Sequence, residues 1–136
     1  MPEFLVPYSD ALLIVALLMI IVMLQSFVGA FFRNAIEKHP AGASIPADHG
    51  SATYRMVRSF ENSLENIALF LPVSALAIAA AVSPAWVWWV TLLFTIGRLG
   101  HWAMYALNIP PLRTAFFAIG FFATLALAVK TALILI

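Results

Sequence analysis

Cysteine is absent from the 136-residue sequence, and charged side chains make up only 10% of it. The absence of cysteine excludes disulfides, thiolate metal sites and a protein thiol as nucleophile, so any thiol chemistry needs a thiol brought by a substrate. The formal net charge of +1 gives no indication of nucleic-acid binding. We find no metal-site pattern, no phosphate-binding glycine loop and no serine–histidine–acid set.

Hydrophobic residues, in contrast, make up 64% of the chain. A helix needs roughly 20 mostly apolar residues to cross a bilayer. Four apolar segments are long enough, at residues 11–32, 62–82, 85–107 and 115–136. They predict one all-α membrane domain over residues 1–136, a four-transmembrane-helix bundle with up-down-up-down topology. The first segment lacks a basic start and follows Glu3 and Asp10, so we interpret it as a retained span and not a cleaved signal peptide.

The connections contain the expected helix-ending residues. Residues 34–52 are dense in proline and glycine and predict the one long loop. Ser83 and Pro84 predict a very tight turn, whereas Pro110 and Pro111 predict the end of the third helix and an extended turn. At the helix starts, the predicted caps are Ser9 or Asp10 for the first helix and Ser51 or Thr53 for the second.

Basic residues are concentrated at the first and third connections, which by the positive-inside tendency face the cytoplasm and leave both termini outside. Those residues are Arg33, Lys38, Arg55, Arg58 and Arg113. For Arg33 we favour a charge anchor at the membrane surface over a ligand contact. We interpret His39 and His49 as solvated loop residues, because their spacing matches no metal pattern.

A polar ladder opens the second span. Arg58, Asn62 and Glu65 step by three or four residues and share one face of a helix that then runs on without charge. Such residues in a membrane helix face a bundle interior or a wet cavity, which makes them a functional-site hypothesis. The alternatives are an interhelical clamp or side chains that snorkel to the membrane surface.

The third span repeats this pattern. Arg98, His101 and Tyr105 share one helix face, and flanking glycines at 97 and 100 leave room for a partner backbone. A salt bridge to Glu65 or Glu61 is the structural alternative for Arg98. For His101 we favour an interior hydrogen bond over a catalytic base.

Arg113 stands at the start of the fourth span, where the positive amino end of the helix and the guanidinium together suit an anion. The alternative is an ordinary basic flank of the membrane. The predicted topology brings all three polar segments to the cytoplasmic half. Arginines recognise carboxylates, and a glutamate among them holds an ammonium group. The site therefore suits a small zwitterion with more than one carboxylate, next to an apolar substrate dissolved in lipid.

Three motifs in order resemble the MAPEG family of membrane-associated proteins in eicosanoid and glutathione metabolism, which includes the microsomal glutathione transferases. They are R-x-x-x-N-x-x-E at 58–65, G-R-x-x-H-x-x-x-Y at 97–105 and P-x-R-T at 111–114. The resemblance implies a homotrimer that binds glutathione as cosubstrate between neighbouring subunits, and no metal. It assigns thiolate stabilisation to Arg113 and glutathione binding to Arg58, Asn62, Glu65, Arg98, Tyr105 and, by a loose alignment, Arg33. Phe60 stands where some members have histidine, which argues against a prostaglandin-type isomerase.

The leading function is therefore a glutathione-dependent transferase or peroxidase, acting on a lipophilic electrophile or hydroperoxide in a bacterial inner membrane. The expected partners are copies of the chain, membrane lipid and that lipophilic substrate. The alternative is a non-catalytic member of the family with a structural or lipid-binding role. A small transporter is disfavoured, because the first span lacks an ionisable residue and no span shows a half-helix break.

Overall fold

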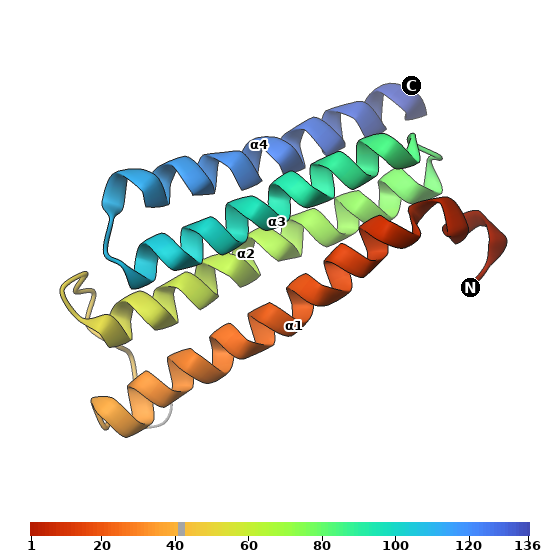
Figure 1. Ribbon diagram of the computed structural model, residues 1–136. Helices are drawn as coiled ribbons and strands as arrows, with labels where there is room; N and C mark the ends of the chain where they lie inside the picture. Colours follow the sequence, from red (N-terminus) through yellow and green to blue (C-terminus); the bar gives the residue numbers. More distant parts are fainter. Residues whose placement is uncertain (41–42) are drawn as a thin grey trace.

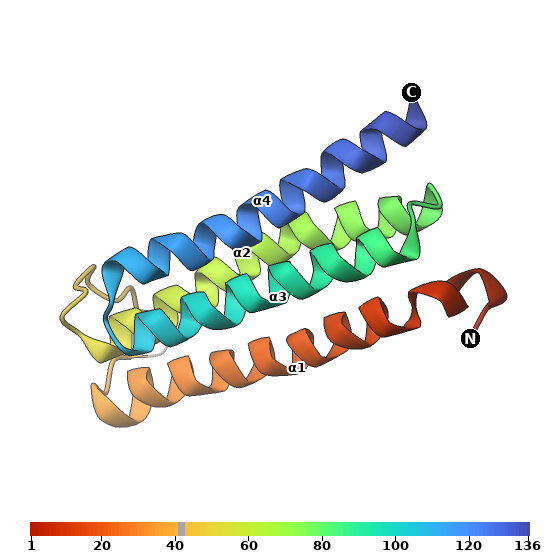
Figure 2. The same ribbon diagram turned by 45° about the horizontal axis from the view of Figure 1, so that its top comes forward.

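The computed structural model describes residues 1–40 and 43–136, which form four long helices lying side by side (Figure 1). The helices are α1 (Ser9–Phe31), α2 (Ala52–Ala79), α3 (Pro84–Ala106) and α4 (Pro110–Leu135). Both termini and the α2–α3 turn lie at one end, and the α1–α2 and α3–α4 connections lie at the other (Figure 2). This arrangement confirms the predicted all-α, up-down-up-down bundle.

Three helical stretches are long and apolar enough to cross a membrane: Glu3–Ile36, Ala52–Ala79 and Pro110–Leu135. The predicted four-helix membrane bundle is confirmed, although α3 is not among these three stretches by hydropathy. Its tryptophans, together with Arg98 and His101, lower its hydropathy. In the bundle, α3 contacts each of the other long helices and buries both of these polar residues among them. Both α2 and α3 lie between α1 and α4, and α3 runs alongside α4 (Figure 1).

Aromatic stacking holds α2 against α3. The rings of Phe70 and Phe94 are both fully buried, with centroids 3.9 Å apart and planes within 5° of parallel. At the end with the termini, the Tyr8 hydroxyl donates to the carbonyl of Val82 over 2.7 Å and ties the start of the chain to the α2–α3 turn. Because lipid tails are as apolar as these side chains, close packing must supply most of the stabilisation between helices.

Glycines set the close approach of α3 and α4. A Cβ on Gly97 would lie 2.7 Å from the backbone nitrogen of Gly120, so only glycine fits there. A Cβ on Gly100 would lie 2.2 Å from the Phe116 ring. The predicted room for a partner backbone is thus confirmed at Gly97, whereas Gly100 makes room for a side chain.

Left-handed residues end α2 and α3. Ala81 has φ 54° and Asn108 has φ 56°. After α2, the amide of Val82 donates to the carbonyl of Ala77 over 2.9 Å, which is the long bond of a Schellman motif. The α3 end repeats this pattern around Asn108, a residue type that tolerates the left-handed region. These bonds explain how both turns reverse the chain so tightly.

Several boundaries differ from the predictions. Pro110 and Pro111 form the first turn of α4 and not an extended turn, since proline is preorganised for that position. The first ten residues also contain a 3₁₀ helix, η1 (Glu3–Tyr8), so α1 continues it and uses no side-chain cap from Ser9 or Asp10. A π-helical segment, η2 (Phe32–Ile36), extends α1 into the predicted loop. The Ser51 cap is confirmed, because its Oγ accepts from the amide of Tyr54 over 3.1 Å.

Candidate functional site

The predicted polar ladder on α2 forms a connected set. Arg58 donates from Nη1 to Oε1 of Glu65 over 2.8 Å and from Nη2 to Oε2 over 3.3 Å. Asn62 donates to the same Oε2 over 3.4 Å. The Glu65 and Arg58 side chains remain 54% and 33% exposed, so this forked pair lies open at the surface of the single chain. Because both partners belong to α2, the pair does not clamp two helices together.

Arg98 reaches the ladder from α3. Its side chain is 0% exposed, and Nη1 donates to Oδ1 of Asn62 over 3.0 Å. Nη2 donates to the carbonyl of Phe117 on α4 over 3.3 Å. The predicted alternative of a salt bridge to a glutamate is therefore wrong. A buried guanidinium without a carboxylate is costly, and inside a membrane bundle such a group is a functional-site hypothesis.

Aromatic rings complete the surroundings of Arg98. The guanidinium carbon lies 5.8 Å from the ring centre of Phe94 and 5.5 Å from that of Phe117. Both distances allow a cation–π attraction, which offsets part of the desolvation cost. Arg98 Nε is buried and makes no hydrogen bond to any residue that the structure describes. The cation is thus held by an amide, a carbonyl and two rings.

His101 connects α3 to the start of α4. Its Nδ1 lies 2.8 Å from the carbonyl oxygen of Arg113. Since a carbonyl only accepts, Nδ1 carries the proton in this contact. The contact agrees with the interior hydrogen bond favoured for His101 and fixes the backbone that carries Arg113. The other ring nitrogen, Nε2, is buried and has no partner among the described residues.

Arg113 lies against Tyr105 and a loop histidine. Its guanidinium carbon is 4.4 Å from the centre of the Tyr105 ring, and Nη1 is 3.1 Å from Nδ1 of His49. In residues 1–40 and 43–136, Arg113 forms no salt bridge. His49 is an exposed loop residue, as predicted, and its contact with Arg113 is one that the sequence analysis did not anticipate. The predicted topology places this loop and Arg113 at the same end of the bundle, which is the only sequence signal for the contact.

Arg33 bonds to its own loop. Its Nη2 donates to the carbonyls of Pro40 and Ala43 over 3.0 and 2.8 Å. It also lines a small cavity of about 120 Å³ between the loop and α2, together with Arg58 and Glu61. The structure thus brings Arg33 next to Arg58, one of the predicted binding residues. The Nη2 group of Arg33 is used to bond the loop carbonyls.

Glu37 closes the base of this loop. Its carboxylate accepts from the Ser51 hydroxyl over 2.8 Å and contacts Nε2 of His39 over 3.0 Å. The hydroxyl of Ser51, and then the His39 ring, hold the pKa of the Glu37 carboxyl below its usual value. These contacts join the end of η2 to the start of α2 and hold the loop over the site end of the bundle.

The predicted site residues other than Arg33, which bonds to its own loop, therefore form one polar column toward one end of the bundle. The column runs from Glu65 and Arg58 through Asn62 to Arg98 on α3. One and two helical turns farther along the same face of α3 lie His101 and Tyr105, the second of which contacts Arg113. The column therefore combines side chains of α2 and α3 with Arg113 of α4, and His49 of the first loop contacts it through Arg113. The described residues contain no cluster of three metal-ligating side chains.

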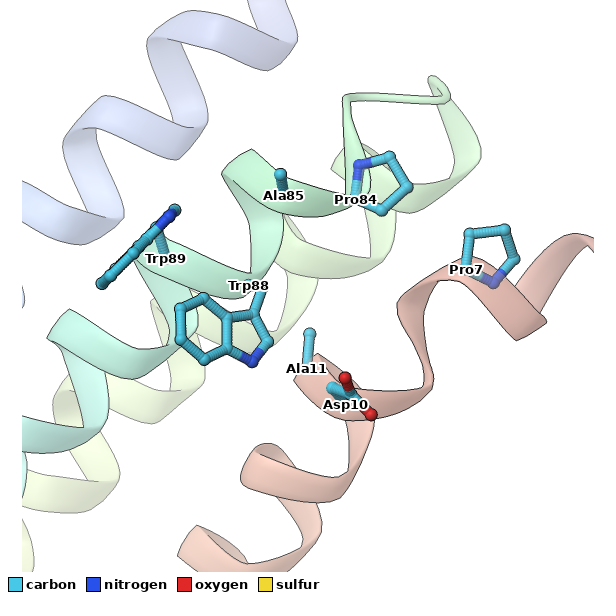
Figure 3. Close-up of a pocket in the computed structure, with 7 residues that line it drawn as sticks. All are labelled: Pro7, Asp10, Ala11, Pro84, Ala85, Trp88 and Trp89. Atoms are coloured by element: carbon cyan, nitrogen blue, oxygen red, sulfur yellow. The ribbon is translucent and has the colours of Figure 1, made fainter.

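A separate pocket of about 260 Å³ lies at the opposite end of the bundle (Figure 3). It is lined by Pro7, Asp10, Ala11, Pro84, Ala85, Trp88 and Trp89. The indoles of Trp88 and Trp89 are nearly perpendicular and 4.6 Å apart. Amphipathic rings favour the membrane–water interface, which suits this end of the helices. None of the predicted site residues lines this pocket.

Comparison with known proteins agrees with the motifs. The model of the MAPEG family matches residues 11–133, nearly the whole chain. The search of curated proteins found no match. The matched range includes all the residues of the polar column, from the first loop to the start of α4.

Proposed function

Because the chain belongs to the MAPEG family and is an integral membrane protein, we propose that it activates the thiol of glutathione for attack on a lipophilic electrophile or hydroperoxide. One observation carries the proposal: Arg113 is a half-buried cation without a carboxylate partner in residues 1–40 and 43–136, at the end of a polar column that also holds Arg98. An anionic sulfur beside Arg113 would supply the missing charge.

The exposed part of the column suits the charged groups of glutathione. Glutathione carries two carboxylates and one ammonium. Arg58 presents a planar fork that binds a carboxylate through two bonds, and Glu65 accepts from an ammonium. In the free chain these two residues pair with each other. A ligand carrying both charges would replace each partner with its own group, and Asn62 and Arg98 would keep their mutual hydrogen bond.

The chemistry follows from the charge of Arg113. A free thiol titrates near pH ~8.5, and a fixed cation beside it lowers that value. Arg113 lies in the first turn of α4, where the helix dipole adds positive potential. With a halogenated dinitrobenzene, the thiolate forms a sulfur–carbon bond, the carbon–halogen bond breaks and halide leaves. With a hydroperoxide, the sulfur takes the terminal oxygen, the alkoxide takes a proton, and a second glutathione releases water and forms the disulfide.

We propose a homotrimer with the site between chains. The cavity beside Arg58 is about 120 Å³, whereas pockets for small ligands span roughly 300–1,000 Å³. The Arg58–Glu65 pair lies open at the surface, so a neighbouring copy would enclose it. We place the protein in a bacterial cytoplasmic membrane, and the positive-inside tendency supports this end facing the cytoplasm with both termini outside.

The competing function is a non-catalytic member of the family whose polar residues hold helices or bind lipid. The contact between Asn62 and Arg98 would serve that role. Two features favour the enzyme. Among the described residues, Arg58 and Glu65 pair within α2 and make no direct side-chain bond to another helix. Arg113 is held by an aromatic ring and a histidine, where a structural cation would be expected to pair with a carboxylate.

In the experiment, purified protein is titrated with glutathione while the ultraviolet absorption of the thiolate is measured. A separate assay measures the rate at which the protein conjugates glutathione to a dinitrophenyl halide. Arg113→Ala is expected to abolish the thiolate band and to lower conjugation by on the order of a hundredfold, the loss typical of removing one charge-stabilising donor. Lys130→Ala, near the far end of α4, is the matched control and should behave as wild type. A wild-type protein without a thiolate band would leave the non-catalytic function ahead.

A further inference from the structure

The loop segment 46–51 is folded so that it holds His49 in one place. The Asp48 carboxylate accepts from the amide of Gly50 over 2.7 Å, which forms a tight side-chain turn. Arg55, in the first turn of α2, donates from Nη1 to the carbonyls of His49 and Gly50 over 2.8 and 2.9 Å. The backbone on each side of His49 is therefore fixed to α2, although the segment has no regular structure.

The His49 ring is held between two tyrosines. It packs edge-on against Tyr54 of α2, with ring centres 5.0 Å apart, and lies tilted 6.1 Å from the ring of Tyr105 of α3. In this position Nδ1 is 3.1 Å from Nη1 of Arg113. A guanidinium has only donors, so Nδ1 must accept and the proton of the neutral ring is on Nε2.

Arg113 is thus restrained on two sides. The Tyr105 ring lies under its guanidinium, and His49 accepts from one of its terminal nitrogens. A free arginine side chain has about 2 kcal/mol of rotamer entropy, so a solvent-facing guanidinium samples many positions unless it is held. Nη2 and Nε of Arg113 make no hydrogen bond to the described residues and keep their donors for a ligand.

We propose that His49 is a positioning residue for the thiolate site. It accepts from Nη1 of Arg113 and holds the guanidinium so that Nη2 and Nε donate to the sulfur of glutathione. His49 acts through Arg113 and does not contact the thiol. This inference rests on the proposed function, and it adds a residue from the first loop to the site on α2, α3 and α4.

Two substitutions separate the acceptor of His49 from its ring. His49→Asn keeps an acceptor on the same branch, because asparagine Oδ1 and histidine Nδ1 are both bonded to Cγ. His49→Phe keeps a ring between the two tyrosines and removes the acceptor. His39→Phe is the matched control: it removes the other histidine of this loop, which contacts Glu37 and not Arg113. The readouts are the thiolate absorption at saturating glutathione and fixed pH, the dissociation constant of glutathione, and kcat.

We expect His49→Phe to lower the thiolate fraction and kcat by roughly tenfold, the effect of losing a hydrogen bond to a charged group, with a dissociation constant within about twofold of wild type. His49→Asn should restore most of the band, and His39→Phe should leave it unchanged. A wild-type band in His49→Phe would overturn the inference. An equal loss in both His49 variants would also overturn it, because the fold of the loop would then matter and the acceptor would not.

A stronger band in His49→Phe would contradict the inference in another way, by showing that His49 competes with the thiol for Arg113. A wild-type protein that binds no glutathione would instead remove the proposed function, and the positioning role with it. The two failures are therefore distinguishable from the wild-type titration alone.

Discussion

Asn62 on α2 accepts a hydrogen bond through Oδ1 from Nη1 of Arg98 on α3, over 3.0 Å, at a guanidinium that is fully buried. This contact links the two predicted motifs most directly. It also makes the amide of Asn62 the only side chain among the described residues that bonds to this cation. The ladder on α2 therefore presents an exposed ion pair and also supports a buried charge.

Removing this support should destabilise the bundle. Asn62→Ala leaves a donor of buried Arg98 unsatisfied, and we expect a loss of about 1–3 kcal/mol. Leu69→Ala, at an exposed position of the same helix, should change stability by less than about 0.5 kcal/mol. Thermal unfolding in detergent measures both variants. Equal melting temperatures for the two would contradict the assigned role of Asn62.

A single methyl group added where α3 and α4 cross should lower the stability of the protein. Gly97→Ala places a Cβ 2.7 Å from a backbone atom of Gly120, so the helices must separate. We expect a loss of about 1–3 kcal/mol, typical of overpacking. Gly29→Ala is the control, because its Cβ would lie 3.6 Å from the nearest atoms of Val57, an ordinary contact. If Gly97→Ala is as stable as Gly29→Ala, the described crossing is incorrect.

The end of α2 should gain stability from a glycine. Ala81 has φ 54°, a conformation that costs an L-residue roughly 1–2 kcal/mol. Ala81→Gly should therefore raise the free energy of unfolding by about 1 kcal/mol. Ala80→Gly, one residue earlier at φ −81°, should lower it, since glycine adds only flexibility there. Denaturation of both variants checks the sign, and a lower stability for Ala81→Gly would refute the assigned turn.

The Glu37 contacts at the base of the first loop should contribute less stability at low pH. The Ser51 hydroxyl and then His39 lower the pKa of Glu37 below 4.5. A carboxyl with a lowered folded-state pKa stabilises the fold above its unfolded-state pKa, and this contribution disappears as the pH falls through the folded-state value. Ser51→Gly keeps an acceptable helix cap, and it should shift the Glu37 titration, followed by NMR, upward toward 4.5. Identical titrations in both proteins would show that the hydroxyl is not the cause.

Contacts within one helix were predictable from the sequence, and contacts between helices were only partly so. The spacing of Arg58, Asn62 and Glu65 places them on one face whatever surrounds the helix. The partner of Arg98 depends on the register of α3 against α2, which periodicity does not contain; the structure selects an asparagine where a glutamate was the alternative.

The path of the first loop was the least predictable element. His49 and Arg113 are 64 positions apart and belong to segments that share only an end of the bundle. Their contact depends on the fold of the loop, which Arg55 fixes through two carbonyls. The turns at Ala81 and Asn108 were also hard to anticipate, because left-handed helix ends usually carry glycine and neither position does.

Calorimetric titration of the purified protein with glutathione tests the central claim, that the polar column binds this tripeptide. We expect saturable binding at or below millimolar concentration, weakened on the order of tenfold by Arg58→Ala, which removes a bidentate carboxylate contact. Arg113→Ala should keep most of the affinity while it loses the thiolate. Wild-type protein that releases no heat of binding at millimolar glutathione, or an Arg58→Ala variant with unchanged affinity, would contradict the account.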